Sequence, residues 1–226
     1  MSTDAHTAHE PTLAERYRSV RERIARAAER IERSESDVML VAVTKFADPG
    51  DIRELIALGH RDFGENRVQN MLQRVAMVDE FLSRSRTLSS VDGLSAKNLP
   101  KASEIRWHMI GTLQRNKVKK IVDCSRLIHS VDNLRLAEEV HAVAVRRERP
   151  VEVLMQVNCS GESQKGGVAP AAAIALAEQM ESMINVRLRG LMTMAAYSDN
   201  PEDSRLTFRR LRDLFDEMQK CGFADG

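Results

Sequence analysis

A lysine directly after a short apolar segment is the residue in this sequence best placed to do chemistry. Residues 38–44 read VMLVAVT, which predicts a buried β-strand, and Lys45 follows at once. Strand alternation puts Lys45 on one face with Val41 and Val43, where apolar walls would disfavour the charged amine and leave a nucleophile for an aldehyde. An ordinary strand-end lysine whose amine reaches water fits the same position. Lys45 is therefore a Schiff-base candidate, with a surface lysine as the alternative.

Two further polar residues lie at or near predicted strand ends. Asn66 follows residues 63–65, FGE, where its amide caps the next helix or contacts a ligand. His108 lies in residues 107–111, WHMIG, and is either a hydrogen-bonded core histidine or an acid–base group. Taken singly, the helix cap and the core histidine are the simpler interpretations.

The glycine-rich residues 160–167 have only a superficial likeness to a phosphate-binding loop. Their sequence, SGESQKGG, does not match GxxxxGK[ST], and the glycines also suit an ordinary turn. The chain contains no HExxH or CxxC pattern for a metal and no GxSxG nucleophile elbow. We therefore predict no metal site and assign no catalytic residue.

Apolar segments alternate with helix-like segments, and this alternation predicts an α/β fold. The predicted strands are 38–44, 62–63, 105–110, 127–131, 151–157 and 186–194, and the helices that follow them are 49–58, 66–82, 114–123, 133–147, 170–184 and 201–220. Helices between consecutive strands imply parallel pairing. An open doubly wound sheet and a (β/α)8 TIM-type barrel both fit, and the absence of GxGxxG after the first strand favours the barrel.

We expect one domain over residues 1–226. A leading helix over 12–33 begins with the capping pair Thr12 and Glu15, and the serine-rich residues 83–103 predict a long loop insertion. Only six βα units precede the last residue, whereas a TIM barrel has eight. The predicted barrel is therefore truncated after about six units.

The composition excludes several classes of protein. The chain has 34 basic and 33 acidic residues and a net charge of +1, which gives no general attraction to nucleic acid. A basic segment with Arg115, Lys117, Lys119 and Lys120 has no interleaved aromatic residues, so we interpret it as solvated surface. No apolar run approaches the roughly 18 residues of a membrane span. Three widely spaced cysteines indicate a reduced, cytoplasmic protein.

Four segments in this order resemble one known family. They are residues 41–45 (VAVTK), 63–69 (FGENRVQ), 107–117 (WHMIGTLQRNK) and 190–194 (GLMTM), and they look like successive signatures of the pyridoxal phosphate homeostasis proteins of YggS/PROSC type. The resemblance runs from about residue 38 to residue 220. It implies a fold similar to the barrel domain of alanine racemase, with pyridoxal 5'-phosphate bound through Lys45.

The resemblance also implies binding partners, and part of the family pattern is missing from this sequence. The family is thought to buffer the cofactor and deliver it to apo forms of pyridoxal phosphate enzymes, without established catalysis. We expect the complete fold to be a monomer. Lys45 and Asn66 are then the cofactor-binding candidates. The family continues beyond the point where this chain ends, into SMGMS-like and VRxGxxIFG-like motifs that supply the last two strands and most phosphate contacts, and these motifs are missing here.

A carrier is favoured over a racemase-like enzyme. Racemisation needs a second base aligned on the substrate α-carbon, and in alanine racemase one base is a tyrosine from a separate β-domain. The only tyrosines here are Tyr17, on the leading helix, and Tyr197, after the last predicted strand. The alternatives are a pyridoxal phosphate-dependent amino-acid racemase-like enzyme and a scaffold that has lost its ligand.

Overall fold

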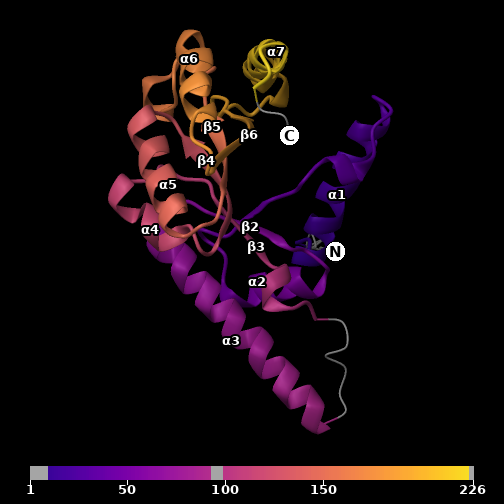
Figure 1. The fold of residues 1–226 in the computed structure, drawn as a ribbon. Coiled ribbons are helices and arrows are strands. Elements are labelled where there is room, and N and C mark those ends of the chain that lie inside the picture. The colour runs from indigo at the N-terminus through magenta and orange to yellow at the C-terminus, as the bar shows by residue number, and fades with distance from the viewer. Residues whose placement is uncertain (1–9, 93–98, 224–226) are drawn as a thin grey trace, which may run out of the picture.

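The structure is a computed structural model that describes residues 10–92 and 99–223. A parallel sheet forms its centre (Figure 1). The strands are β1 (Ala42–Val43), β2 (Asp62–Glu65), β3 (Arg106–Met109), β4 (Ser125–Val131), β5 (Val151–Gln156) and β6 (Val186–Met192). The α-helices are α1 (Leu13–Glu29), α2 (Pro49–Ala57), α3 (Val68–Asp92), α4 (Val118–Ile121), α5 (Leu134–Arg146), α6 (Pro170–Glu181) and α7 (Arg205–Lys220).

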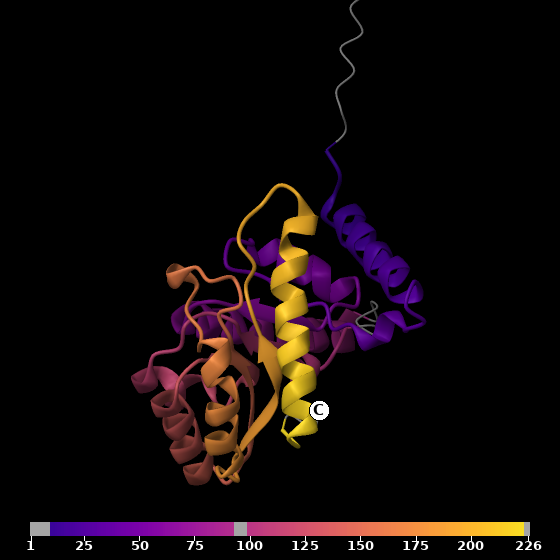
Figure 2. The same cartoon turned by 90° about the horizontal axis from the view of Figure 1, so that it is seen from above.

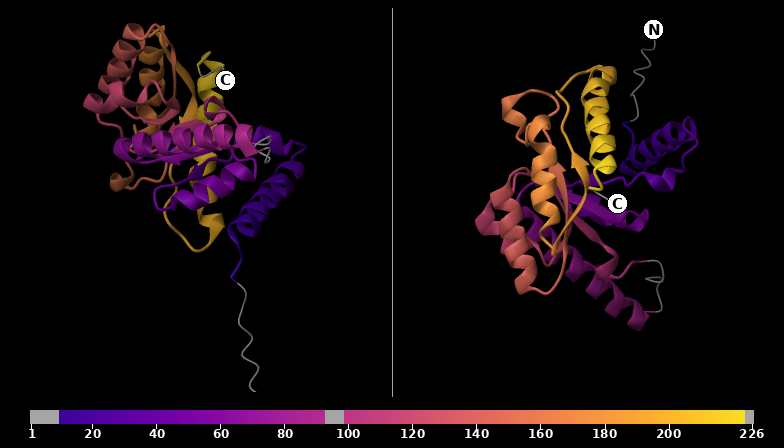
Figure 3. Two further views of the ribbon diagram at one scale, coloured as in Figure 1. Left: turned by 90° about the horizontal axis from the view of Figure 1, so that it is seen from below. Right: turned by 45° about the horizontal axis from the view of Figure 1, so that its top comes forward.

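The strand order identifies the architecture. Each strand lies beside the next one in sequence, from β1 to β6, and every pair is parallel. A doubly wound sheet reverses its order part-way, whereas crossovers that always step to the next strand keep the helices on one outer face. Helices α4, α5 and α6 form such a row outside β4, β5 and β6 (Figures 1 and 3), and α7 lies along β6 (Figure 2). The predicted barrel-type fold with six βα units is confirmed.

The leading helix begins where the sequence predicts and ends earlier. Thr12 caps α1, since its hydroxyl accepts a hydrogen bond from the Glu15 amide while the Glu15 carboxylate accepts one from the Thr12 amide. The helix ends at Glu29 rather than residue 33, and Glu32 adopts a φ of 55°. Helix α1 packs against α2, so this segment is part of the fold.

The predicted loop insertion over 83–103 is wrong for its first half. Helix α3 continues through these residues to Asp92, because no glycine or proline interrupts the chain before Gly93. An ion pair between Glu80 and Arg84, one turn apart, supports its exposed face. Residues 93–98 lie outside the described residues, and a short 3₁₀ turn, Ala102–Glu104, leads into β3.

Two other elements are shorter than predicted. The expected strand over 38–44 pairs with its neighbour only over β1, and the expected helix over 114–123 is a 3₁₀ turn, Arg115–Lys117, followed by the single turn of α4. Apolar runs indicate burial, but they do not determine how many residues find a partner strand. The remaining strands and helices agree with the predictions to within a few residues at each end.

The hydrophobic core lies between the sheet and its outer helices. Phe63 of β2 and Trp107 of β3 are buried with ring centroids 5.5 Å apart, and Met71 and Val78 of α3 belong to the same core. Successive strand residues point to opposite faces. Gly64 and His108 directly follow Phe63 and Trp107 in their strands. They therefore face the opposite, concave side of the sheet.

Candidate functional site

Lys45 lies in a tight turn at the carboxyl end of β1. The Ala47 amide donates to the Thr44 carbonyl oxygen at 3.0 Å, so Lys45 and Phe46 occupy the two central positions of a β-turn. Lys45 is exposed, and its Nζ lies 5.1 Å from the centroid of the Phe46 ring, which is itself 89% exposed. The apolar walls expected around this amine are not present, since Val43 on the same face is 50% exposed.

The floor beside this turn is apolar. Val43 pairs with Gly64 of β2, and a Cβ on Gly64 would lie 3.0 Å from Val41 and 3.3 Å from Ile110. The absence of a side chain at Gly64 therefore lets Val41 and Ile110 approach one another across β2. Val43, which pairs with Gly64, lies two residues before Lys45.

Buried polar groups stabilise the turn that carries Lys45. The Thr44 hydroxyl donates to Glu65 Oε1 at 2.6 Å, and Glu65 is fully buried at the end of β2. Arg74 of α3 places its Nε 3.8 Å from the same carboxylate oxygen and donates from Nη2 to the Ala47 carbonyl oxygen at 2.5 Å. The sequence places Glu65 in the FGE segment before Asn66 without indicating this role, and it gives no signal for Arg74.

Asn66 does not cap α3. The helix begins at Val68, two residues later, and the buried Oδ1 of Asn66 has no hydrogen-bond partner among the described protein atoms. The backbone of Asn66 instead contacts the end of β3, because a Cβ on Gly111 would lie 2.1 Å from the Asn66 carbonyl oxygen. A buried acceptor without a donor favours the ligand-contact interpretation over the helix cap.

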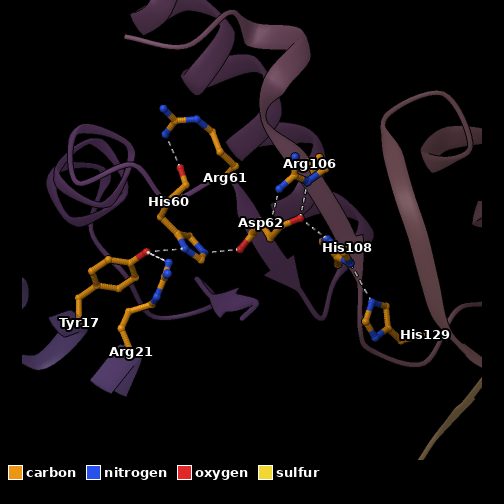
Figure 4. Close-up of polar contacts among 8 residues, drawn as sticks. All are labelled: Tyr17, Arg21, His60, Arg61, Asp62, Arg106, His108 and His129. Atoms are coloured by element: carbon orange, nitrogen blue, oxygen red, sulfur yellow. Dashed lines mark hydrogen bonds and ion pairs between the residues drawn. The ribbon is translucent and has the colours of Figure 1, made fainter. Parts of the chain in front are cut away.

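His108 is a buried core histidine, as its simpler interpretation predicted. Its Nε2 lies 3.1 Å from Asp62 Oδ1 and its Nδ1 lies 2.9 Å from His129 Nε2 (Figure 4). Arg106 donates two hydrogen bonds to the Asp62 carboxylate. Burial alone would raise the pKa of Asp62, but the hydrogen bonds from Arg106 and His108 outweigh it and hold that pKa well below its usual range.

A second part of this network lies at the opposite end of the strands from Lys45. His60, just before β2, donates from Nε2 to the Asp62 carbonyl oxygen at 2.6 Å, and the Tyr17 hydroxyl lies 3.3 Å from His60 Nδ1 (Figure 4). Burial lowers the pKa of His60. These side chains line a cavity of about 270 Å³ beneath α1. Because the strands are parallel, Tyr17 and Lys45 lie at opposite ends of the sheet.

In residues 160–167 the lysine and one glycine are already engaged in contacts within the protein. The Lys165 ammonium donates to the Ala195 carbonyl oxygen at 2.8 Å and lies 3.4 Å from Glu162. A Cβ on Gly167 would collide with the backbone of Asn158 at 2.8 Å, so this glycine serves a close chain approach. Within residues 10–92 and 99–223, no three His, Cys, Asp or Glu side chains gather as metal ligands would.

Comparison with known proteins identifies the family. The family model for the alanine racemase N-terminal domain matches residues 16–225. A pyridoxal phosphate homeostasis protein of Aquifex aeolicus is 39% identical over 91% of this chain and 81% of that protein. The chain belongs to the pyridoxal phosphate homeostasis protein family. A further member, from Pseudomonas aeruginosa, is 35% identical over 90% of this chain and 79% of that protein.

Solved structures of other proteins share the fold. PipY of Synechococcus elongatus with PLP bound has a TM-score of 0.70 and 29% identity, covering 92% of this chain and 82% of that one. Alanine racemase of Clostridium difficile has a TM-score of 0.63 at 12% identity, covering 91% of this chain and 47% of that enzyme, which is a likeness of fold alone. No helix in the described part of the chain is long and apolar enough to cross a membrane.

Proposed function

We propose that this protein holds pyridoxal 5'-phosphate reversibly through a Schiff base on Lys45 and takes part in cofactor homeostasis without catalysis. The observation that carries the proposal is the placement of an exposed lysine amine in the turn after β1, at the carboxyl end of a parallel sheet. Relatives named as pyridoxal phosphate homeostasis proteins and the PLP-bound PipY structure support the choice of cofactor.

The chemistry required of Lys45 is a simple condensation. With the cofactor bound, the Lys45 amine would condense with its aldehyde, forming a C=N bond and releasing one water; hydrolysis would reverse the step, and no oxidant or reductant would be needed. The bound cofactor supplies an electron-accepting ring and an aldehyde. Val41, Val43 and Ile110 provide an apolar surface that suits such a ring, and the unpartnered Asn66 Oδ1 offers an acceptor to a donor on the ligand.

The side chains of this chain favour a carrier over a racemase-like enzyme. A racemase needs a second base near the amine. Tyr17 lies at the far end of the strands and its hydroxyl is engaged with His60, while Tyr197 is 90% exposed and its hydroxyl donates to Asp199 at 3.2 Å. Neither tyrosine is held beside Lys45 by the contacts it makes.

The setting that we propose is the cytoplasm, with the protein acting as a monomer and apo forms of pyridoxal phosphate enzymes as recipients. Cys124, Cys159 and Cys221 are all free thiols, which suits a reducing compartment. Burial raises the pKa of the Cys124 and Cys159 thiols, so these two are poor nucleophiles.

Trapping of the imine tests the proposal. Cofactor titration should give a visible absorption band, and borohydride reduction followed by peptide mapping should place the adduct on Lys45. Lys45→Ala should abolish the band while changing the free energy of unfolding by no more than about 0.5 kcal/mol, because the side chain is exposed. Lys119→Ala, on an exposed position of α4, is the matched control and should retain the band.

Three results would contradict the proposal. An adduct confined to Lys165 or to the lysines of residues 117–120 would move the site away from β1. A band that survives Lys45→Ala would do the same. A wild-type protein that gives no band at all would support the scaffold that has lost its ligand.

A further inference from the structure

We infer that Arg74, together with Glu65, is a positioning residue that fixes the turn carrying Lys45. The inference rests on the proposed role of Lys45 in binding the cofactor. It concerns two charged side chains that do not themselves meet the ligand. Both act through the backbone and the side chains at the two ends of one β-turn.

The first end of the turn is held through Thr44. Its amide donates to the Gly64 carbonyl oxygen at 3.0 Å, and its hydroxyl donates to Glu65 Oε1 at 2.6 Å. Thr44 is 1% exposed and Glu65 is not exposed at all, so water does not compete for this hydrogen bond. The side chain just before Lys45 is therefore fixed to the end of β2.

The second end is held by Arg74. Its Nη2 donates to the Ala47 carbonyl oxygen at 2.5 Å, while its Nε faces Glu65 Oε1 at 3.8 Å. The Arg74 guanidinium thus links Ala47, the last residue of the turn, to the Glu65 carboxylate, which binds Thr44, the first residue of the turn. The planar fork of arginine suits this task, since its donors point in fixed directions.

The burial of the group explains why a charge pair is used at this point. A fully buried carboxylate is costly unless a cation and hydrogen bonds compensate it, and Arg74 and Thr44 provide both at Oε1, whereas the buried Oε2 has no hydrogen-bond partner among the described protein atoms. Lys45 and Phe46, between the two anchored ends, stay exposed. The geometry therefore combines a fixed backbone with a free amine, which is what a reversible covalent site requires.

Amide hydrogen exchange tests the turn without any cofactor. In Arg74→Met, the exchange of residues 44–51 should become about tenfold faster or more, because a charge-assisted hydrogen bond to Ala47 is lost. Arg84→Met is the matched control on the same helix, since Arg84 forms an exposed ion pair with Glu80, and it should leave this exchange unchanged. Arg74→Lys should restore part of the protection if a donor to Ala47 is the essential feature.

Borohydride trapping then relates the turn to the amine. After brief exposure to cofactor, the share of adduct on Lys45 relative to the other lysines of the same molecule should fall about tenfold in Arg74→Met and stay at the wild-type share in Arg84→Met. Because the other lysines serve as internal references, global unfolding would raise their labelling as well and is recognised at once. Glu65→Gln, which keeps an acceptor for Thr44 but removes the charge facing Arg74, should lower the Lys45 share by less.

Different results would contradict the positioning role of Arg74 and the proposed function of Lys45. Unchanged exchange of residues 44–51 in Arg74→Met, or an unchanged Lys45 share in that variant, overturns the positioning role. A wild-type protein that shows no preference for Lys45 overturns the proposed function, while faster exchange in Arg74→Met would still support the anchored turn. Thermal unfolding of each variant shows whether the fold itself persists.

Discussion

His108 and His129 lie ring to ring across β3 and β4, with Nδ1 of the first 2.9 Å from Nε2 of the second. Because His108 Nε2 donates to the Asp62 carboxylate, its Nδ1 accepts a hydrogen bond from the Nε2–H of His129 when both rings are neutral. Burial, which disfavours the charged ring, is the main cause that lowers the pKa of His129 to about 4, and the electrostatic influence of His108 adds to it. The folded protein therefore favours neutral His129.

This pair predicts a loss of stability between about pH 6.5 and pH 4. The pKa of His129 is about 4 in the folded protein and about 6.5 when unfolded, so its contribution is fully present above 6.5 and is lost as the pH falls towards 4. We expect a loss of roughly 2 to 3 kcal/mol, allowing for partial exposure of the ring. Urea unfolding at pH 7.5 and at pH 4.5 measures it. In His129→Gln, which keeps a donor for His108, the change should be smaller, and an equal change in both proteins would contradict the assignment.

Gly111 predicts a different kind of effect. Its missing Cβ would lie 2.1 Å from the carbonyl oxygen of Asn66 and 2.7 Å from two further backbone atoms of that residue. Gly111→Ala must displace the end of β2 or β3, because no flexible side chain takes up the overlap. We expect a loss of about 1 to 3 kcal/mol in the free energy of unfolding and weaker cofactor binding. Denaturant unfolding and cofactor titration measure the two effects.

Gly50→Ala is the control for this substitution. Gly50 lies in the first turn of α2, and no heavy atom comes within 4 Å of its missing Cβ. The same chemical change should therefore raise the free energy of unfolding by up to about 1 kcal/mol. If both alanine variants lost stability to the same degree, the contact between Gly111 and Asn66 would not be the cause.

The carrier interpretation predicts the absence of specific turnover. Alanine incubated with the loaded protein in deuterium oxide should exchange its α-proton no faster than with free cofactor, because neither tyrosine is held beside Lys45. Proton NMR follows the exchange. Stereospecific exchange that disappears in Lys45→Ala would establish an enzyme instead. If the exchange also disappeared in Tyr197→Phe, Tyr197 would be the second base.

The sequence alone determined the order of strands and helices and the position of Lys45. Alternating apolar and amphipathic segments indicate burial, and parallel strands gather their carboxyl ends at one edge. A lysine after the first strand is therefore placed, without coordinates, at the edge where barrel folds carry their ligand sites. The residue pattern did not show how many residues of each strand pair or where each helix ends. The segment 38–44 pairs only at β1, and α3 runs to Asp92, because tertiary contacts and the position of the next glycine decide where elements end.

Only the tertiary structure brought together side chains from separate elements. Arg74 is 27 residues from Ala47 and lies on a helix whose sequence gives no sign that one arginine turns inward. His108 meets His129 only because β3 and β4 pair with a shift in register, which a residue pattern does not encode. Local sequence fixes which face a side chain occupies along its own element, whereas its partners depend on how separate elements pack.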